Sequence, residues 1–222
     1  MRICELRQLG RVRYGDALLL QQSLVEQRKH SEIPDQLLLL EHPHVVTLGR
    51  NAHPENILAS DDVLQRTGIE VHHIKRGGDV TYHGPGQLVG YPIFDLREWK
   101  RDVLAYVRTI EQVLIDALGT FGITGERLEG ATGVWVNGAK VAAIGVHISR
   151  WVTSHGFALN VSTDLSYFQY IVPCGLTKPV TSLRALGCDA SFETVAAAVV
   201  EQVSNKFKCQ VLEPALATER TL

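Results

Sequence analysis

A cysteine lies between a proline and a glycine in the segment Val172-Pro173-Cys174-Gly175. Neither neighbour favours a helix or a central strand, so we expect the thiol in a loop, where Gly175 leaves space beside the sulfur. A thiolate in such a place could act as a nucleophile. Free cysteines more often serve as small, inert apolar residues, and that alternative is open for Cys174.

The other three cysteines are weaker candidates, because Cys4 and Cys209 fall in predicted strands and Cys188 in a turn. None of the four forms a CxxC pair, and four thiols in 222 residues are too few for a disulfide scaffold. The N-terminus lacks the apolar core of a signal peptide, and no apolar run approaches the ~20 residues of a membrane span. We therefore expect reduced thiols in a cytoplasmic protein.

A cysteine nucleophile needs a neighbour that favours the thiolate. Lys140 follows the predicted tight turn Asn137-Gly138 and is flanked by small apolar residues. It could be desolvated there and take part in proton transfer, although a solvated hairpin lysine is the commoner case. The histidines that could serve instead are His83, His147 and His155.

A glycine-rich run, RGGDVTYHGPGQ, occupies residues 76–87. Its four glycines and one proline predict a loop in place of a regular helix or a central strand. Consecutive N–H groups in such loops often form concave sites for anions or oxyanions. Thr81, Tyr82, His83 and Gln87 add polar side chains, which favours a binding site over a long surface turn.

The elements that would position these groups are strands and helices in irregular succession. Strands are predicted at 2–9, 36–41, 45–50, 69–74, 87–96, 132–136, 140–149, 155–161 and 208–213. Helices are predicted at 14–29, 61–66, 102–121, 163–169 and 191–207. Pro92 indicates an edge or a bulge in its strand. Because strands adjoin strands, the pattern predicts an α+β fold with a mixed or antiparallel sheet and packed helices.

Composition excludes several classes of protein. The chain is 45% hydrophobic and 21% charged, with a formal net charge of -2, which is ordinary globular usage and not that of a nucleic-acid-binding protein. His42, His44 and His53 lack the spacing of a metal site, so no zinc centre is expected. Its length fits one large domain or two small ones, and no linker divides it.

Four segments together resemble one family, the octanoyl-[acyl-carrier-protein]:protein N-octanoyltransferases, also called lipoyl(octanoyl) transferases. Residues 76–87 are similar to the family signature, 138–145 to its lysine segment, 173–175 to its cysteine segment and 155–160 to a segment that lines the acyl site. The resemblance covers residues 1–213 and leaves 214–222 as a tail. It implies one catalytic domain over 1–213, with a fold like that of biotin protein ligases and lipoate ligases.

The resemblance also implies an activity in lipoate biosynthesis and protein lipoylation. Octanoyl-acyl carrier protein would donate its acyl group to Cys174 as a thioester, and Lys140 would favour the thiolate and shuttle protons. The acceptor would be a lysine of a lipoyl domain, in 2-oxoacid dehydrogenase complexes or the glycine cleavage H protein. Nucleic acid, membrane, metal and cofactor are not implied. The implied acyl-binding residues are Arg76, Gly77, Gly78, Asp79, Val80, Thr81, Tyr82, His83, Ala143, Ile144, Gly145, Gly156, Phe157 and Ala158.

Three other functions are compatible with the same residues. An ATP-dependent lipoate or biotin ligase would use this fold without a cysteine nucleophile. A cysteine thioesterase would hydrolyse the acyl-enzyme, and a non-catalytic acyl-binding protein would use the glycine-rich run only to hold a ligand. The transferase needs no ATP, because a thioester is already activated.

Overall fold

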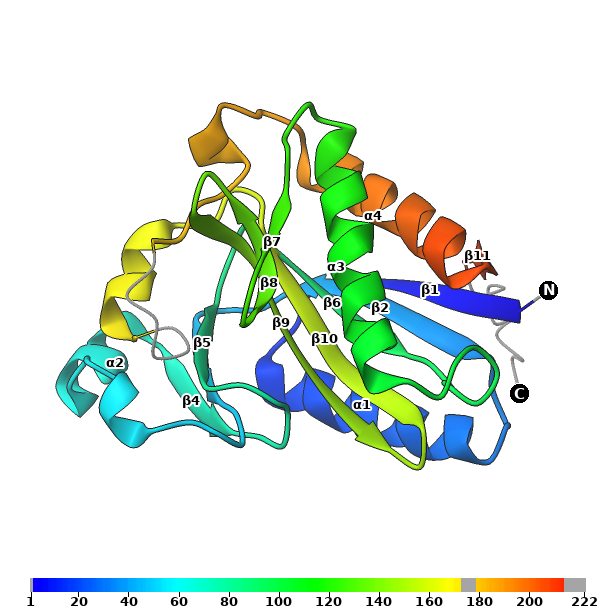
Figure 1. Ribbon diagram of the computed structural model, residues 1–222. Coiled ribbons are helices and arrows are strands. Elements are labelled where there is room, and N and C mark those ends of the chain that lie inside the picture. The colour runs from blue at the N-terminus through cyan, green and yellow to red at the C-terminus, as the bar shows by residue number, and fades with distance from the viewer. Residues whose placement is uncertain (1, 173–178, 214–222) are drawn as a thin grey trace, which may run out of the picture.

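A computed structural model of the chain describes residues 2–172 and 179–213 (Figure 1). Its strands form an eight-stranded sheet in the order β11-β1-β2-β6-β10-β9-β8-β7 and a three-stranded sheet in the order β4-β3-β5. The large sheet contains β1 (Arg2–Arg11), β2 (Asp35–Glu41), β6 (Gln87–Ile93), β7 (Glu126–Leu128), β8 (Ala131–Val136), β9 (Ala139–Ser149), β10 (Val152–Asn160) and β11 (Cys209–Leu212). The small sheet contains β3 (Val45–Leu48), β4 (Glu70–His73) and β5 (Val80–His83).

Both sheets are mixed. Strand β1 runs parallel to β2 and β11, while the other pairs of the large sheet are antiparallel. In the small sheet β3 is parallel to β4 and antiparallel to β5. The predicted α+β class with a mixed sheet is confirmed.

Helices cover both faces of the large sheet, α3 and α4 on one and α1 on the other (Figure 1). Strand β2 shows why: Leu37 and Leu39 face the core under α3 and α4, while Leu38 and Leu40 face the core under α1. Successive side chains of a strand alternate between faces, so an unbroken leucine run is buried on both. The helices are α1 (Tyr14–Lys29), α2 (Asp61–Thr67), α3 (Val103–Gly119) and α4 (Phe192–Phe207), with 3₁₀ turns at Pro54–Asn56, Leu165–Tyr170 and Arg184–Leu186. No helix among the described residues has the length and apolar character needed to cross a bilayer.

The glycine-rich run contains a strand, so the prediction of a loop throughout 76–87 is wrong. Residues Val80–His83 form β5, an edge strand whose partner is β3. Their β-branched and aromatic side chains favour extended structure once β3 supplies hydrogen bonds. The short strand β7 carried no recognisable pattern and was not predicted.

Strand β6 is central, lying between β2 and β10, so the edge position expected from Pro92 is also wrong. The Thr153 hydroxyl donates to the Pro92 carbonyl at 2.7 Å, which places the polar backbone groups of Pro92 on the β10 side. There the β6–β10 ladder stops at the pair Gly90–Phe157. Pro92 has no N–H to donate, and because the ladder is interrupted at this point, no carbonyl of β10 is left without a donor.

Strand β10 crosses β6 closely at this gap. A Cβ atom on Gly156 would lie 2.2 Å from the Gly90 carbonyl oxygen and 2.6 Å from Cδ of Pro92. Glycine is required here by this approach of two backbones.

We expect Gly156→Ala to lower the free energy of unfolding by on the order of 1–3 kcal/mol, because neither neighbouring backbone can move without disturbing the central strands. Gly15→Ala is the matched control, since nothing lies within 4 Å of its added Cβ and it sits in α1. The control should be neutral or slightly stabilising. Urea unfolding measures both, and equal effects would contradict this account of β10.

Candidate active site

A narrow slot is lined by residues of both sheets and of α1. One wall consists of cross-strand pairs of β9 and β10, namely Ala143–Ala158, Ile144–Phe157 and Gly145–Gly156. Four of these six residues are alanine or glycine, so their side chains project little into the slot, whose volume is about 40 Å³. The slot brings together ten of the predicted acyl-binding residues: Arg76, Gly78, Thr81, His83, Ala143, Ile144, Gly145, Gly156, Phe157 and Ala158.

The glycine-rich loop before β5 packs directly on β9. The N–H of Gly77 donates to the Val146 carbonyl at 2.9 Å. A Cβ atom on Gly145 would lie 2.9 Å from the Gly77 carbonyl oxygen, and one on Gly49 would lie 2.3 Å from that of Gly78. Glycines on both sides of the contact therefore allow this approach, and Gly78 adopts a positive φ of 88°.

Hydrogen bonds fix the two charged residues of this loop. Arg76 is 7% exposed, and its guanidinium donates to the carbonyl and the hydroxyl of Thr47, each at 2.8 Å. The Asp79 carboxylate accepts from the Asn56 amide at 2.6 Å and does not line the slot. Arg76 therefore contributes a buried positive charge to the slot, whereas Asp79 holds a neighbouring turn.

Alternation along β5 separates the remaining predicted residues. Thr81 and His83 line the slot. Val80 and Tyr82 belong to the apolar core of the small sheet, where the Tyr82 hydroxyl and Nδ1 of His44 are 2.7 Å apart. The prediction treated the four residues alike, and the structure places only two of them on the slot.

A chain of hydrogen bonds links the slot to Lys140. Nδ1 of His83 lies 2.8 Å from Oε1 of Gln87, whose amide donates to Oδ1 of Asn160 at 2.9 Å. The Asn160 amide donates to the Thr181 carbonyl, and the Thr181 N–H donates to the Lys140 carbonyl, each at 2.9 Å. Gln87 and Asn160 lie in the motifs recognised in the sequence, but their part in this chain comes only from the structure.

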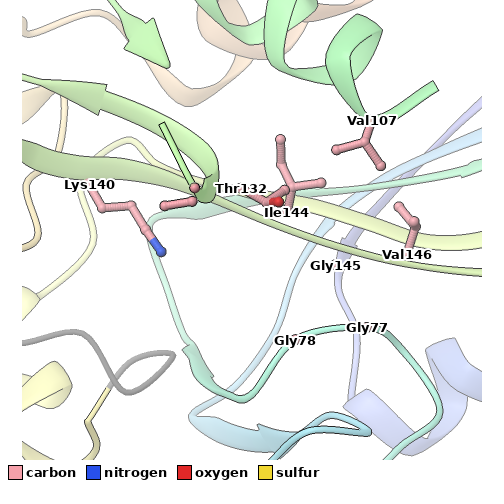
Figure 2. A pocket seen from close by; sticks show the side chains of 10 residues that line it. Gly77, Gly78, Val107, Thr132, Lys140, Ile144, Gly145 and Val146 are labelled. Carbon is pink, nitrogen blue, oxygen red and sulfur yellow. The ribbon is translucent and has the colours of Figure 1, made fainter. Parts of the chain in front are cut away.

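Lys140 lines a second pocket of about 390 Å³, which it shares with Gly77 and Gly78 (Figure 2). Figure 2 shows its ammonium on the side of β9 that faces the glycine loop. The residue is only 8% exposed, and Nζ lies 5.0 Å from the centre of the Trp135 ring, within reach of a cation–π interaction. The alternative of a solvated hairpin lysine is therefore wrong.

The described residues on either side of Cys174 are anchored to the site. The Val172 N–H donates to the Asn56 carbonyl at 2.7 Å, and the Lys140 N–H donates to the Pro179 carbonyl at 2.8 Å. Cys174 itself lies outside the described residues, so its position relative to Lys140 stays a prediction.

Comparisons with known proteins identify the family. Residues 13–204 match the family model described as the lipoyl protein ligase A/B catalytic domain. An octanoyltransferase from Solibacter usitatus is 64% identical over 212 residues, 96% of each chain. Another from Koribacter versatilis is 57% identical over 92% of this chain and 84% of its own. The chain belongs to the octanoyltransferase family.

Solved structures show the same fold at low sequence identity. Lipoate-protein ligase A bound with ATP superimposes with a TM-score of 0.79 at 17% identity, covering 98% of this chain and 90% of its own. A biotin protein ligase from Aquifex aeolicus gives a TM-score of 0.53 at 15% identity, covering 92% and 68%. The family resemblance and the fold predicted from the sequence are both confirmed.

Two tyrosines complete the slot of this octanoyltransferase and were not predicted. Tyr14 begins α1 and Tyr91 lies in β6. Neither belongs to a motif, and only the packing of α1 on β6 and β10 brings them to the slot. His155, considered in the sequence as a neighbour of a thiolate and as the first residue of the segment 155–160, lines the slot as well.

Three buried histidines around the slot are neutral. Burial lowers the pKa of His83 to about 3, and that of His42 to about 4. Burial, together with the charge of Arg76, lowers the pKa of His155 to about 4. His42 illustrates the neutral form: Nδ1 donates to the Val12 carbonyl, so Nε2 accepts from the Tyr91 hydroxyl, both at 2.7 Å.

None of the other three cysteines, all in the described part of the chain, lines the slot or the pocket beside Lys140. Cys4 and Cys209 are buried, and a hydrogen bond with Cys209 together with burial raises the pKa of the Cys4 thiol. Cys188 is a half-buried free thiol beyond the 3₁₀ turn that ends at Leu186. In the described part of the chain, no three His, Cys, Asp or Glu side chains are grouped to hold a metal ion.

These histidines predict acid sensitivity. Below their ordinary pKa of 6.5, histidines of the unfolded chain bind protons that His42, His83 and His155 in the folded protein do not. Stability should therefore be complete above about pH 6.5 and fall toward pH 4, by at most about 1.4 kcal/mol per pH unit for each histidine.

Urea unfolding at pH 7, 6 and 5 tests this. This pH range lies above the ordinary pKa values of carboxylates, so the change of the unfolding free energy with pH reports the protonation of histidines. His83→Gln should reduce the slope of the unfolding free energy against pH by the equivalent of up to one proton. The new glutamine keeps a hydrogen-bond partner for Gln87. Stability that does not change between pH 6.5 and 5 would contradict the neutral assignment.

Proposed function

We propose that this octanoyltransferase moves an octanoyl group from octanoyl-acyl carrier protein, through a thioester on Cys174, to a lysine of a lipoyl domain. The observation that carries the proposal is the position of the slot: its residues Thr81, Ala143 and Ala158 also line a small cavity with Lys140. An acyl tail would lie along apolar cross-strand pairs with its carbonyl end toward Lys140. Burying each methylene would contribute about 0.8 kcal/mol.

The chemistry consists of two acyl exchanges. The Cys174 thiolate attacks the thioester carbonyl, the bond to the carrier sulfur breaks, and the carrier thiol leaves with a proton. The neutral amine of the acceptor lysine then attacks the new thioester and loses a proton as the amide forms and the Cys174 thiolate leaves. Lys140, a buried cation beside the slot, would stabilise the thiolate and carry these protons.

Each exchange passes through an oxyanion that needs hydrogen-bond donors. Gly77 and Gly78 belong to the glycine-rich run, whose N–H groups were considered for such a site. The N–H of Gly77 already donates to Val146, which removes it as a donor. Gly78 lines both the slot and the Lys140 pocket, so its backbone is the better candidate.

The proposed partners follow from the family resemblance. Octanoyl-acyl carrier protein would be the donor, and lipoyl domains of 2-oxoacid dehydrogenase complexes and the glycine cleavage H protein would be the acceptors. The catalytic unit would span residues 1–213. The cytoplasm, where both kinds of partner would meet the enzyme, is the proposed location.

The covalent intermediate is tested by intact mass. Octanoyl-acyl carrier protein without acceptor or ATP should add one octanoyl group, which hydroxylamine removes and a lipoyl domain discharges onto a lysine. Cys174→Ala should lose both labelling and transfer, while Cys188→Ala, the control with a half-buried thiol, should keep both. Transfer that survives in Cys174→Ala would mean direct attack by the acceptor lysine.

The same assay separates the other candidate functions. An absolute need for ATP would indicate a ligase. Release of free octanoate in the presence of acceptor would indicate a thioesterase. Stoichiometric binding without turnover would indicate an acyl-binding protein.

Lys140 is tested by the reactivity of Cys174. Lys140→Ala should slow acylation by about 10²–10⁴ and shift the alkylation profile of Cys174 to higher pH, because a cationic neighbour is lost. Lys140→Arg keeps the positive charge but is a poor proton donor, so it should restore alkylation more than turnover. An alkylation profile that is unchanged in Lys140→Ala would remove this residue from the mechanism.

A further inference from the structure

Three cavities follow one another along β9 and β10. The first lies beside Lys140 and shares Ala143 and Ala158 with the slot. Beyond the slot lies a cavity of about 530 Å³, lined by residues of α1, of the segment after β4 and of the far ends of β9 and β10. Of the residues that the structure describes, only His155 lines both the slot and this far cavity, which places it between them.

The backbone and the side chain of His155 are held in place. The residue is 5% exposed, and its N–H donates to Oε1 of Gln21 at 2.8 Å. Its ring meets the Tyr91 ring edge-on, with 6.3 Å between the ring centres. Its φ is +55°, a left-handed conformation that glycine adopts without cost. The backbone at this position therefore favours glycine, yet the residue is a histidine.

The distance to His155 matches the proposed substrate. Along β9, the pair Ala143–Ala158 is three residues from the pair Val146–His155, or roughly 10 Å at ~3.3 Å per residue. An eight-carbon chain contains seven C–C bonds of about 1.5 Å in a zigzag, so its extended length is on the order of 9 Å. A chain whose carbonyl end lies at the Ala143–Ala158 pair, which the slot shares with the Lys140 cavity, thus ends near His155.

We propose that His155, positioned by Gln21, is the end wall of the slot and limits the acyl chain to about eight carbons. The inference rests on the proposed function, since it requires that the slot hold the acyl tail. Behind the wall, the lining of the far cavity is mostly polar, and Leu18, Val25 and Ile74 form its apolar part, against which a longer tail would lie.

His155→Gly removes the wall without straining the backbone. Transfer from hexanoyl-, octanoyl-, decanoyl- and dodecanoyl-acyl carrier protein to a lipoyl domain measures chain-length preference as kcat/KM. We expect the kcat/KM for the dodecanoyl donor, divided by that for the octanoyl donor, to rise at least tenfold relative to the unsubstituted enzyme. His155→Asn, whose shorter side chain tolerates a positive φ, should give an intermediate ratio.

Ser31→Gly is the matched control. Ser31 has a φ of +58° and is exposed after α1, away from the slot, so glycine there should leave the ratio unchanged. An unchanged ratio in an active His155→Gly would overturn the end wall while leaving octanoyl transfer intact. Loss of activity with every chain length in both His155 variants, with normal melting curves, would place His155 in the chemistry and also overturn it. A wild-type enzyme that transfers no octanoyl group would overturn the proposed function itself.

Discussion

The site depends on one backbone contact, the packing of the glycine-rich loop against the open edge of β9. The Gly77 N–H donates to the Val146 carbonyl, and Gly145 lets the two chains approach to a distance that a Cβ atom would forbid. This contact joins the small sheet to the large one, so the slot exists only where the two meet. The contact requires glycine for a steric reason, because a Cβ atom would collide with the neighbouring backbone. Side chains elsewhere could not remove that collision.

Among the described residues that line the slot, Arg76 is the one charged side chain. Burial keeps His83 and His155 neutral, and Thr47 holds the guanidinium of Arg76. An apolar tail can therefore lie among these groups without displacing strongly hydrated ions. Lys140, the cation proposed to act in the chemistry, lines the adjoining cavity and lies against the ring of Trp135.

The segment that contains Cys174 is tied at both ends to elements of the site. Asn56, at the end of the 3₁₀ turn after β3, binds one end at Val172, and Lys140 of β9 binds the other at Pro179. Because Asn56 also holds the Asp79 carboxylate, the same turn fixes the glycine-rich loop. The glycine-rich loop, Lys140 and the two described ends of the cysteine segment are thus held by shared hydrogen-bond partners.

The sequence by itself determined the mixed α+β class, most of its elements and the family, because hydrophobic periodicity and the motif around residues 76–87 are local signals. It also named most residues of the slot, since three of the four motifs contribute directly to its walls. It could not decide which of Val80 to His83 face the slot, because alternation needs a known register with β3. Only the tertiary structure placed Pro92 in a central strand, brought Tyr14 to the slot, and set His155 between two cavities. Those facts arise from contacts between segments far apart in the chain, such as the hydrogen bond between His155 and Gln21, 134 residues away, and no local pattern encodes them.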